Sequence, residues 1–151
     1  MHPELSKQLV RQQLQEVFDT EGLLSPALQF VDETYPSLYF RFLNVRQEVR
    51  MIRFECSNYD FQAIQVTPVD PETRLPLPVD RWMTRNGSSF PLHPMFDNHP
   101  FLCLQGTRDF YLFPGHGPTV DGDRWERWRP ELPLKSLLAV IKVKFQLGEW
   151  A

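Results

Sequence analysis

Histidine and cysteine side chains gather in one window of the sequence, at His93, His99, Cys103 and His116. Imidazole and thiol groups titrate near neutral pH, and a cysteine becomes a strong nucleophile when its surroundings stabilise the thiolate. One interpretation is a zinc site with these four side chains as ligands. Their spacing matches no common zinc module and the sequence has no CxxC pair, so we expect no metal and no other cofactor.

Cys103 has two further interpretations. It is a protease-like nucleophile if a histidine base and a carboxylate lie beside it in the fold, although no recognised signature surrounds it. It is an inert core thiol if it is buried, as reduced cysteines commonly are. The second cysteine, Cys56, follows an expected strand, and one possible disulfide is too little to frame a fold of 151 residues.

The elements that must position these side chains are predicted from apolar periodicity. An amphipathic helix runs from Pro3 to about Glu21, and a second helix covers residues 134–147. Between them lies an antiparallel meander of four strands, at residues 23–33, 38–45, 48–54 and 61–66. This order predicts an α+β fold in a single domain, residues 1–151.

The last of these strands is predicted to turn Phe61, Ile64 and Val66 toward the core. Two proline-rich stretches, residues 67–94 and 113–129, interrupt the regular pattern. Long structureless segments are uncommon in compact domains and usually carry function. We therefore expect both stretches to pack around the cysteine.

Composition excludes several classes of protein. With 42% hydrophobic and 23% charged residues, the chain buries enough apolar surface to fold, which excludes a disordered protein. The net charge of −3 and the mixed signs along the chain argue against a nucleic-acid binder. We recognise neither a leader peptide nor a membrane-spanning run, so we expect a soluble cytoplasmic protein with no membrane partner.

Residues 93–104, HPMFDNHPFLCL, resemble the active-site segment of ubiquitin-conjugating enzymes, in which a His-Pro-Asn tripeptide precedes a Cys-Leu pair. In that family the histidine lies ten positions before the cysteine, and here 103 − 93 = 10. Tyr59 and Phe61 match the family's Tyr-Pro-Phe turn. Residues 128–134, WRPELPL, resemble the Trp-x-Pro-x-Leu-x-Leu that leads into its crossover helix. With the order of the elements, the resemblance extends over roughly residues 3–147.

The chain departs from the family pattern in several places. Met95 stands where the family has the asparagine credited with stabilising the oxyanion. Extra residues lie before His93, and residues 105–127 form an insertion after the cysteine. The family's C-terminal helices are expected to be absent, because the chain ends just after the second predicted helix. Such variants resemble the prokaryotic families found in bacterial ubiquitin-like and antiphage operons.

The resemblance implies an acyl transferase. Cys103 would carry a ubiquitin-like protein, or another protein C-terminus, as a thioester and transfer it to an amine of a target protein, in antiphage defence. The implied partners are a ubiquitin-like modifier, an activating enzyme and the target. The alternative is a non-catalytic binding module of the same fold, similar to RWD-type domains.

Candidate roles follow for the polar residues around Cys103. Because Met95 cannot donate a hydrogen bond from its side chain, the donors to test for the oxyanion are Asn98, His99 and His116. His93 and Pro94 would brace the loop, and Arg108 would hold the insertion through a carboxylate. Asp121 and Asp123 would steer an incoming lysine, although both have the ordinary alternative of solvated turn carboxylates, and His116 that of an exposed loop histidine.

Overall fold

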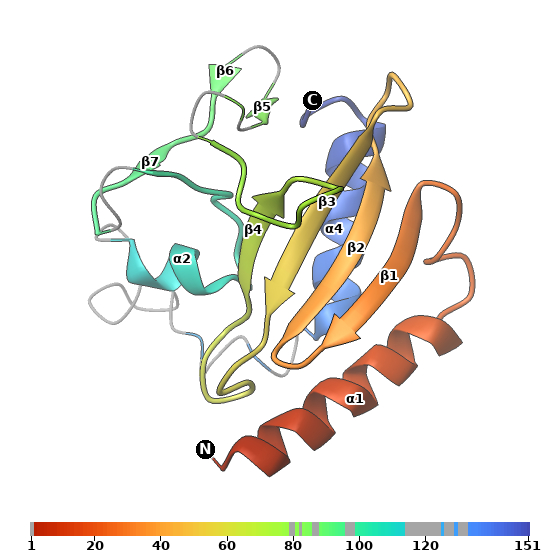
Figure 1. Cartoon of the computed structure of the whole chain (residues 1–151), viewed down its shortest axis with the longest axis vertical. Helices are drawn as coiled ribbons and strands as arrows, with labels where there is room; N and C mark the ends of the chain where they lie inside the picture. Colours follow the sequence, from red (N-terminus) through yellow and green to blue (C-terminus); the bar gives the residue numbers. More distant parts are fainter. Residues whose placement is uncertain are drawn as a thin grey trace.

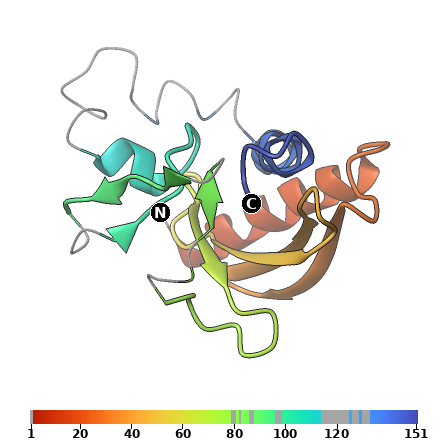
Figure 2. The ribbon, with the colours of Figure 1, turned by 90° about the horizontal axis from the view of Figure 1, so that it is seen from above.

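The computed structural model describes residues 2–78, 81, 83–85, 88–95, 99–113, 125, 129 and 133–151. Its centre is a four-stranded antiparallel sheet with the strand order β1-β2-β3-β4. The long helices α1 and α4 both lie against one face of this sheet and contact each other (Figure 1, Figure 2). The core is the layer between the sheet and the two helices, and the predicted α+β class is confirmed.

Helix α1 spans Pro3–Asp19. Proline occupies its first turn, where the missing N–H costs nothing, and the His2 side chain accepts a hydrogen bond from the Glu4 N–H. Val10, Leu14 and Val17 form its buried face. This spacing of three and four residues is that of one helix face, as predicted from the sequence.

The sheet strands are β1 (Leu28–Thr34), β2 (Ser37–Leu43), β3 (Val49–Glu55) and β4 (Gln65–Val69). Phenylalanines on the helix side of β2 and β3 make the centre of the core: Phe40 and Phe54 are fully buried with ring centroids 5.3 Å apart. The predicted fourth strand begins too early, since β4 starts at Gln65 and Phe61 is 63% exposed. Residues 57–62 form turns instead, with Asn58 at φ +58°, so the strand alternation cannot include Phe61.

The chain after β4 crosses the opposite face of the sheet (Figure 2). Residues 70–78 are held there by Arg74, which pairs with Asp32 of β1 at 2.6 Å and lies over the Tyr39 ring of β2. Two short hairpins follow, β5 (Thr84–Arg85) with β6 (Ser88–Ser89), and β7 (Leu92–His93) with β8 (His99–Pro100). The first proline-rich stretch is therefore partly ordered as strands.

A short helix, α2 (Arg108–Leu112), was not predicted, whereas α4 (Leu134–Gln146) was. Leu138, Ile141 and Phe145 of α4 are fully buried against the sheet. Trp150, beyond its end, packs edge-on against Phe145. Within the described residues, no helix has the length and apolarity needed to cross a membrane.

Candidate thiol site

Cys103 is an exposed residue in a buried run. Leu102 before it is 1% exposed and Leu104 after it is 8% exposed, with Phe101 at 3%. The apolar neighbours fix the backbone on both sides and leave the thiol at the surface. The core-thiol interpretation of Cys103 is therefore wrong.

Main-chain and side-chain hydrogen bonds hold both ends of this segment. The Phe101 N–H donates to the Pro91 carbonyl at 3.0 Å, which ties it to the start of the β7–β8 hairpin. On the other side, the Thr107 hydroxyl donates to the Leu104 carbonyl at 2.6 Å. Gly106 lies between them at φ +99°, a conformation that side chains disfavour, and its N–H donates to the Tyr111 hydroxyl at 3.2 Å.

His93 is fully buried and joins this loop to α2. Its Nε2 donates to the Asp109 carbonyl oxygen at 2.9 Å, and its Nδ1 accepts from the Met95 N–H at 3.2 Å. These two bonds require the tautomer with the proton on Nε2. The ring also packs edge-on against Phe101 and Phe113. Both nitrogens are engaged with the backbone, so His93 is unsuited to bind a metal ion.

Arg108 joins the same helix to the sheet. Its guanidinium pairs with Glu55 at 3.0 Å, with both side chains only 18% exposed. It also donates to the carbonyls of Ala63 and Ser57, each at 3.2 Å, and the Arg108 N–H donates to the Ile64 carbonyl at 2.8 Å. The carboxylate that the sequence could not identify is that of Glu55.

Asp109, which the sequence analysis did not single out, is a second polar residue of α2 at this site. It is 8% exposed, and burial raises the pKa of its carboxyl above the usual range, against the opposing effect of a 3.3 Å hydrogen bond from Gln65. The side chain is thus buried, and its hydrogen bond from Gln65 links α2 to β4. An aspartate in the first turn of a short helix carries no sequence signal for such burial.

The structure describes only part of the predicted constellation. The backbone of His99 pairs with His93 in the β7–β8 hairpin, and Pro94 is exposed in the turn that follows His93. Met95 is 65% exposed. Asn98, His116, Asp121 and Asp123 lie outside the described residues, as does most of the second proline-rich stretch. Among the described residues, no three histidine, cysteine or acidic side chains are grouped as metal ligands.

Cys56 differs from Cys103 in its access to solvent. It is fully buried, its Sγ donates to the Phe54 carbonyl at 3.5 Å, and the two cysteines do not form a disulfide. Burial raises the pKa of the Cys56 thiol far above its usual range, so that almost no thiolate forms at neutral pH.

Iodoacetamide should therefore modify Cys103 in the native protein about 10³-fold or more faster than Cys56, because Cys56 reacts only when the core opens. Mass spectrometry of quenched aliquots measures the two rates. Cys103→Ser should remove the fast phase and Cys56→Ser should keep it, while both cysteines react in guanidinium chloride. Equal rates for the two thiols in native protein would contradict this assignment.

Comparison with known proteins adds little information about the function of this site. No family model matches the chain. It is similar to a protein of Sinorhizobium fredii described as "Uncharacterized protein y4jH", with 25% identity over 123 residues. The match covers 63% of this chain, and the chain spans only 58% of that relative's length. Neither an activity nor a family follows from this similarity, so the site must be interpreted from its own chemistry.

Proposed function

We propose that this chain is a cysteine acyl carrier of the ubiquitin-conjugating type, in which Cys103 holds the C-terminus of a ubiquitin-like protein as a thioester. The observation that carries the proposal is the exposed thiol on a segment anchored at both ends, ten residues after a buried histidine that bonds the backbone. The helix, four-stranded meander and final helix around it support the same interpretation. We place the activity in the bacterial cytoplasm, where thiols stay reduced, and in antiphage defence.

The chemistry has two acyl transfers. In the first, the Cys103 thiolate attacks the thioester carbonyl carbon on the activating enzyme, a new C–S bond forms, and the enzyme's thiolate leaves. In the second, an amine of the target attacks the new thioester, an amide bond forms, and the Cys103 thiolate leaves while a base accepts the proton of the amine. A thiol suits both steps, because it is a good nucleophile as a thiolate and a good leaving group.

Each tetrahedral intermediate needs a hydrogen-bond donor for its oxygen. Met95 has no donor on its side chain, and its N–H is already bound to His93. The donor must therefore come from another residue, for which Asn98, His99 and His116 remain the candidates. Asp121 and Asp123 remain candidates for steering the lysine.

The test is a loading reaction with a cognate activating enzyme, its ubiquitin-like modifier and ATP. The expected product is an adduct of this chain and the modifier that survives a non-reducing gel and disappears with dithiothreitol. No adduct, with an activating enzyme that is itself charged, would refute the proposal.

A second function is favoured by Met95, which leaves the family's oxyanion position without its asparagine. In this alternative the chain is a binding module of similar fold and forms no covalent bond. It would bind the charged activating enzyme or the modifier with the same affinity after Cys103→Ala, and no thiol-sensitive adduct would form with the parent protein.

His116→Ala should slow transfer from the Cys103 thioester to lysine by ~10² or more and leave loading nearly unchanged, because the activating enzyme drives loading. Single-turnover discharge of the preformed thioester to free lysine measures the first rate. His2→Ala, at the start of α1, is the control for removal of a histidine. Equal losses in loading and discharge would contradict a role in transfer, and no loss would leave His116 an ordinary loop residue.

A further inference from the structure

Helix α4 carries apolar residues on two sides. One side is buried against the sheet. On the side turned away from the sheet, Val140 is 41% exposed, Val143 is 47% exposed, and Leu147, the residue that caps the helix, is 69% exposed. Together with the partly buried Ser136, these residues form the outer stripe of α4. A helix that is apolar on both sides is typically covered by protein on both sides.

The outer stripe has the spacing of a coiled-coil seam. Its four residues follow one another at intervals of four, three and four positions. This alternation keeps the side chains on one line along a helix, and it is the spacing at which the side chains of two helices interlock. A pocket of about 300 Å³ lies on the same line, and it is lined by Ala139, Val140, Val143, Lys144 and Glu149. The surface therefore has both projecting side chains and a hollow to receive them.

The charged side chains beside the outer stripe are engaged within the chain. Lys144 pairs with Glu149 at 3.2 Å, and the Lys142 ammonium group donates to two carbonyl oxygens in the turn after α1. Lys135 lines a different pocket, together with Glu16. The stripe thus fits a partner surface that is apolar and brings no excess charge. The stripe itself is such a surface, so a second copy of the chain meets this requirement.

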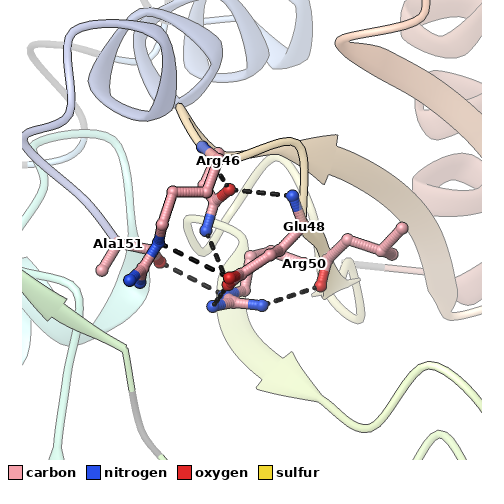
Figure 3. Close-up of polar contacts among 6 residues, drawn as sticks. Arg46, Glu48, Arg50 and Ala151 are labelled. Atoms are coloured by element: carbon pink, nitrogen blue, oxygen red, sulfur yellow. Dashed lines mark hydrogen bonds and ion pairs between the residues drawn. The ribbon is translucent and has the colours of Figure 1, made fainter.

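Hydrogen bonds fix the end of the stripe. The Leu147 N–H donates to the Val143 carbonyl at 2.9 Å. Gly148, at φ +72°, then turns the chain away from the helix axis. Arg50 of β3 donates to an oxygen of Ala151 at 3.2 Å, which ties the chain after α4 to the sheet (Figure 3). A partner therefore meets an ordered surface and loses little free energy in ordering it.

We infer that two copies of this chain pair through their outer stripes, with the two α4 helices antiparallel about a twofold axis. Positions 136 and 147 lie equally far from the midpoint of the stripe, as do positions 140 and 143. An antiparallel pair centred there sets Val140 opposite Val143 of the second copy, and Leu147 opposite Ser136. Large side chains then meet small ones at both ends. A parallel pair would set Leu147 against Leu147 and Ser136 against Ser136, which packs unevenly.

Sedimentation equilibrium tests the pairing. Every protein used carries Cys103→Ser, so that the exposed thiol forms no disulfide between copies. One helix pair buries less surface than a standard interface, so we expect a dissociation constant on the order of 10–100 µM. Val143→Glu places a charge at the centre of the contact in both copies and should raise this constant about 100-fold or more.

Leu5→Glu is the matched control, because Leu5 is an aliphatic residue, 58% exposed, on the other long helix. It should change the dissociation constant less than about twofold, as expected for an exposed site outside the contact. The inference is overturned if the chain remains monomeric at about 1 mM, well above the expected constant. It is overturned equally if Leu5→Glu weakens the pairing as much as Val143→Glu does.

Disulfide cross-linking tests the direction of the helices. Ser136→Cys and Leu147→Cys are prepared as separate proteins, again with Cys103→Ser, and are oxidised in air with copper phenanthroline. A mixture should give the mixed disulfide, identified by mass spectrometry. Neither protein alone should cross-link, because its two equivalent positions lie about 16 Å apart along the antiparallel helices, too far for a disulfide. Cross-linking of either protein with itself, or absence of the mixed disulfide, would overturn the antiparallel pairing.

Discussion

Cys103→Ala is expected to abolish the adduct with the modifier completely. Alanine has no nucleophilic atom, and Cys56, fully buried with a raised pKa, has no access to the activating enzyme. The measurement is the loading reaction followed by a non-reducing gel. An adduct on the Cys103→Ala protein would refute the assignment of the nucleophile.

The variant Cys103→Ser tests whether residue 103 itself carries the modifier or only lies near the reacting groups. A serine at this position can accept the modifier as an oxyester, which survives dithiothreitol because an alkoxide leaves less readily than a thiolate. Loading should be slower than in the parent protein, since serine is the weaker nucleophile. Cys56→Ser is the matched control, because it removes the other thiol, and it should load at the parent rate.

The regular elements were predictable because their signals are local. Pro3 and the apolar residues of α1 recur at helical spacing, and those of α4 do the same, so the start of both helices was predicted at the residue observed. Strands β2 and β3 were predicted to within a few residues of their observed bounds, because apolar and polar side chains partly alternate along them. The first strand was predicted to begin at residue 23, but β1 starts at Leu28, because the chain first makes a turn in which Ser25 and Leu28 bond each other.

The errors lie where distant contacts decide the conformation. Phe61 fits a strand pattern, yet the turns before Gln65 place it in solvent. Helix α2 has only five residues, too short for periodicity to reveal, and its first N–H is bound by the Ile64 carbonyl. The partner of Arg108 is Glu55, at the end of β3, and no local pattern joins two residues so far apart in the sequence.

At the candidate site, the sequence singled out Cys103 and His93 but did not predict the contacts that hold them. Cys103 is exposed because Leu102 and Leu104 on either side of it are buried. The sequence of this segment is equally compatible with a buried thiol, so the exposure could not be predicted. The position of His93 ten residues earlier came from a family resemblance, whereas its bonds to Asp109 and Met95 come from the fold. Asp109 itself was missed, because its burial results from the packing of α2 against β4.

Arg108→Ala is expected to lower the free energy of unfolding by about 3–5 kcal/mol. The change removes one ion pair and two hydrogen bonds and leaves the Glu55 carboxylate, 18% exposed, without its cation. Urea denaturation followed by tryptophan fluorescence measures the free energy of unfolding. Arg108→Lys should recover only part of the loss, because an ammonium group can pair with Glu55 but cannot reach both carbonyls in the same fixed geometry.

Arg74→Ala separates the effect of burial from that of ion-pair distance. The Arg74–Asp32 pair is shorter than the Arg108–Glu55 pair, at 2.6 Å against 3.0 Å, but its side chains are 36% and 40% exposed. Water screens such a pair, so this variant should cost only about 1 kcal/mol even with the loss of the contact to Tyr39. If Arg108→Ala also cost about 1 kcal/mol or less, Arg108 would not be the anchor that joins α2, and with it the segment of Cys103, to the sheet.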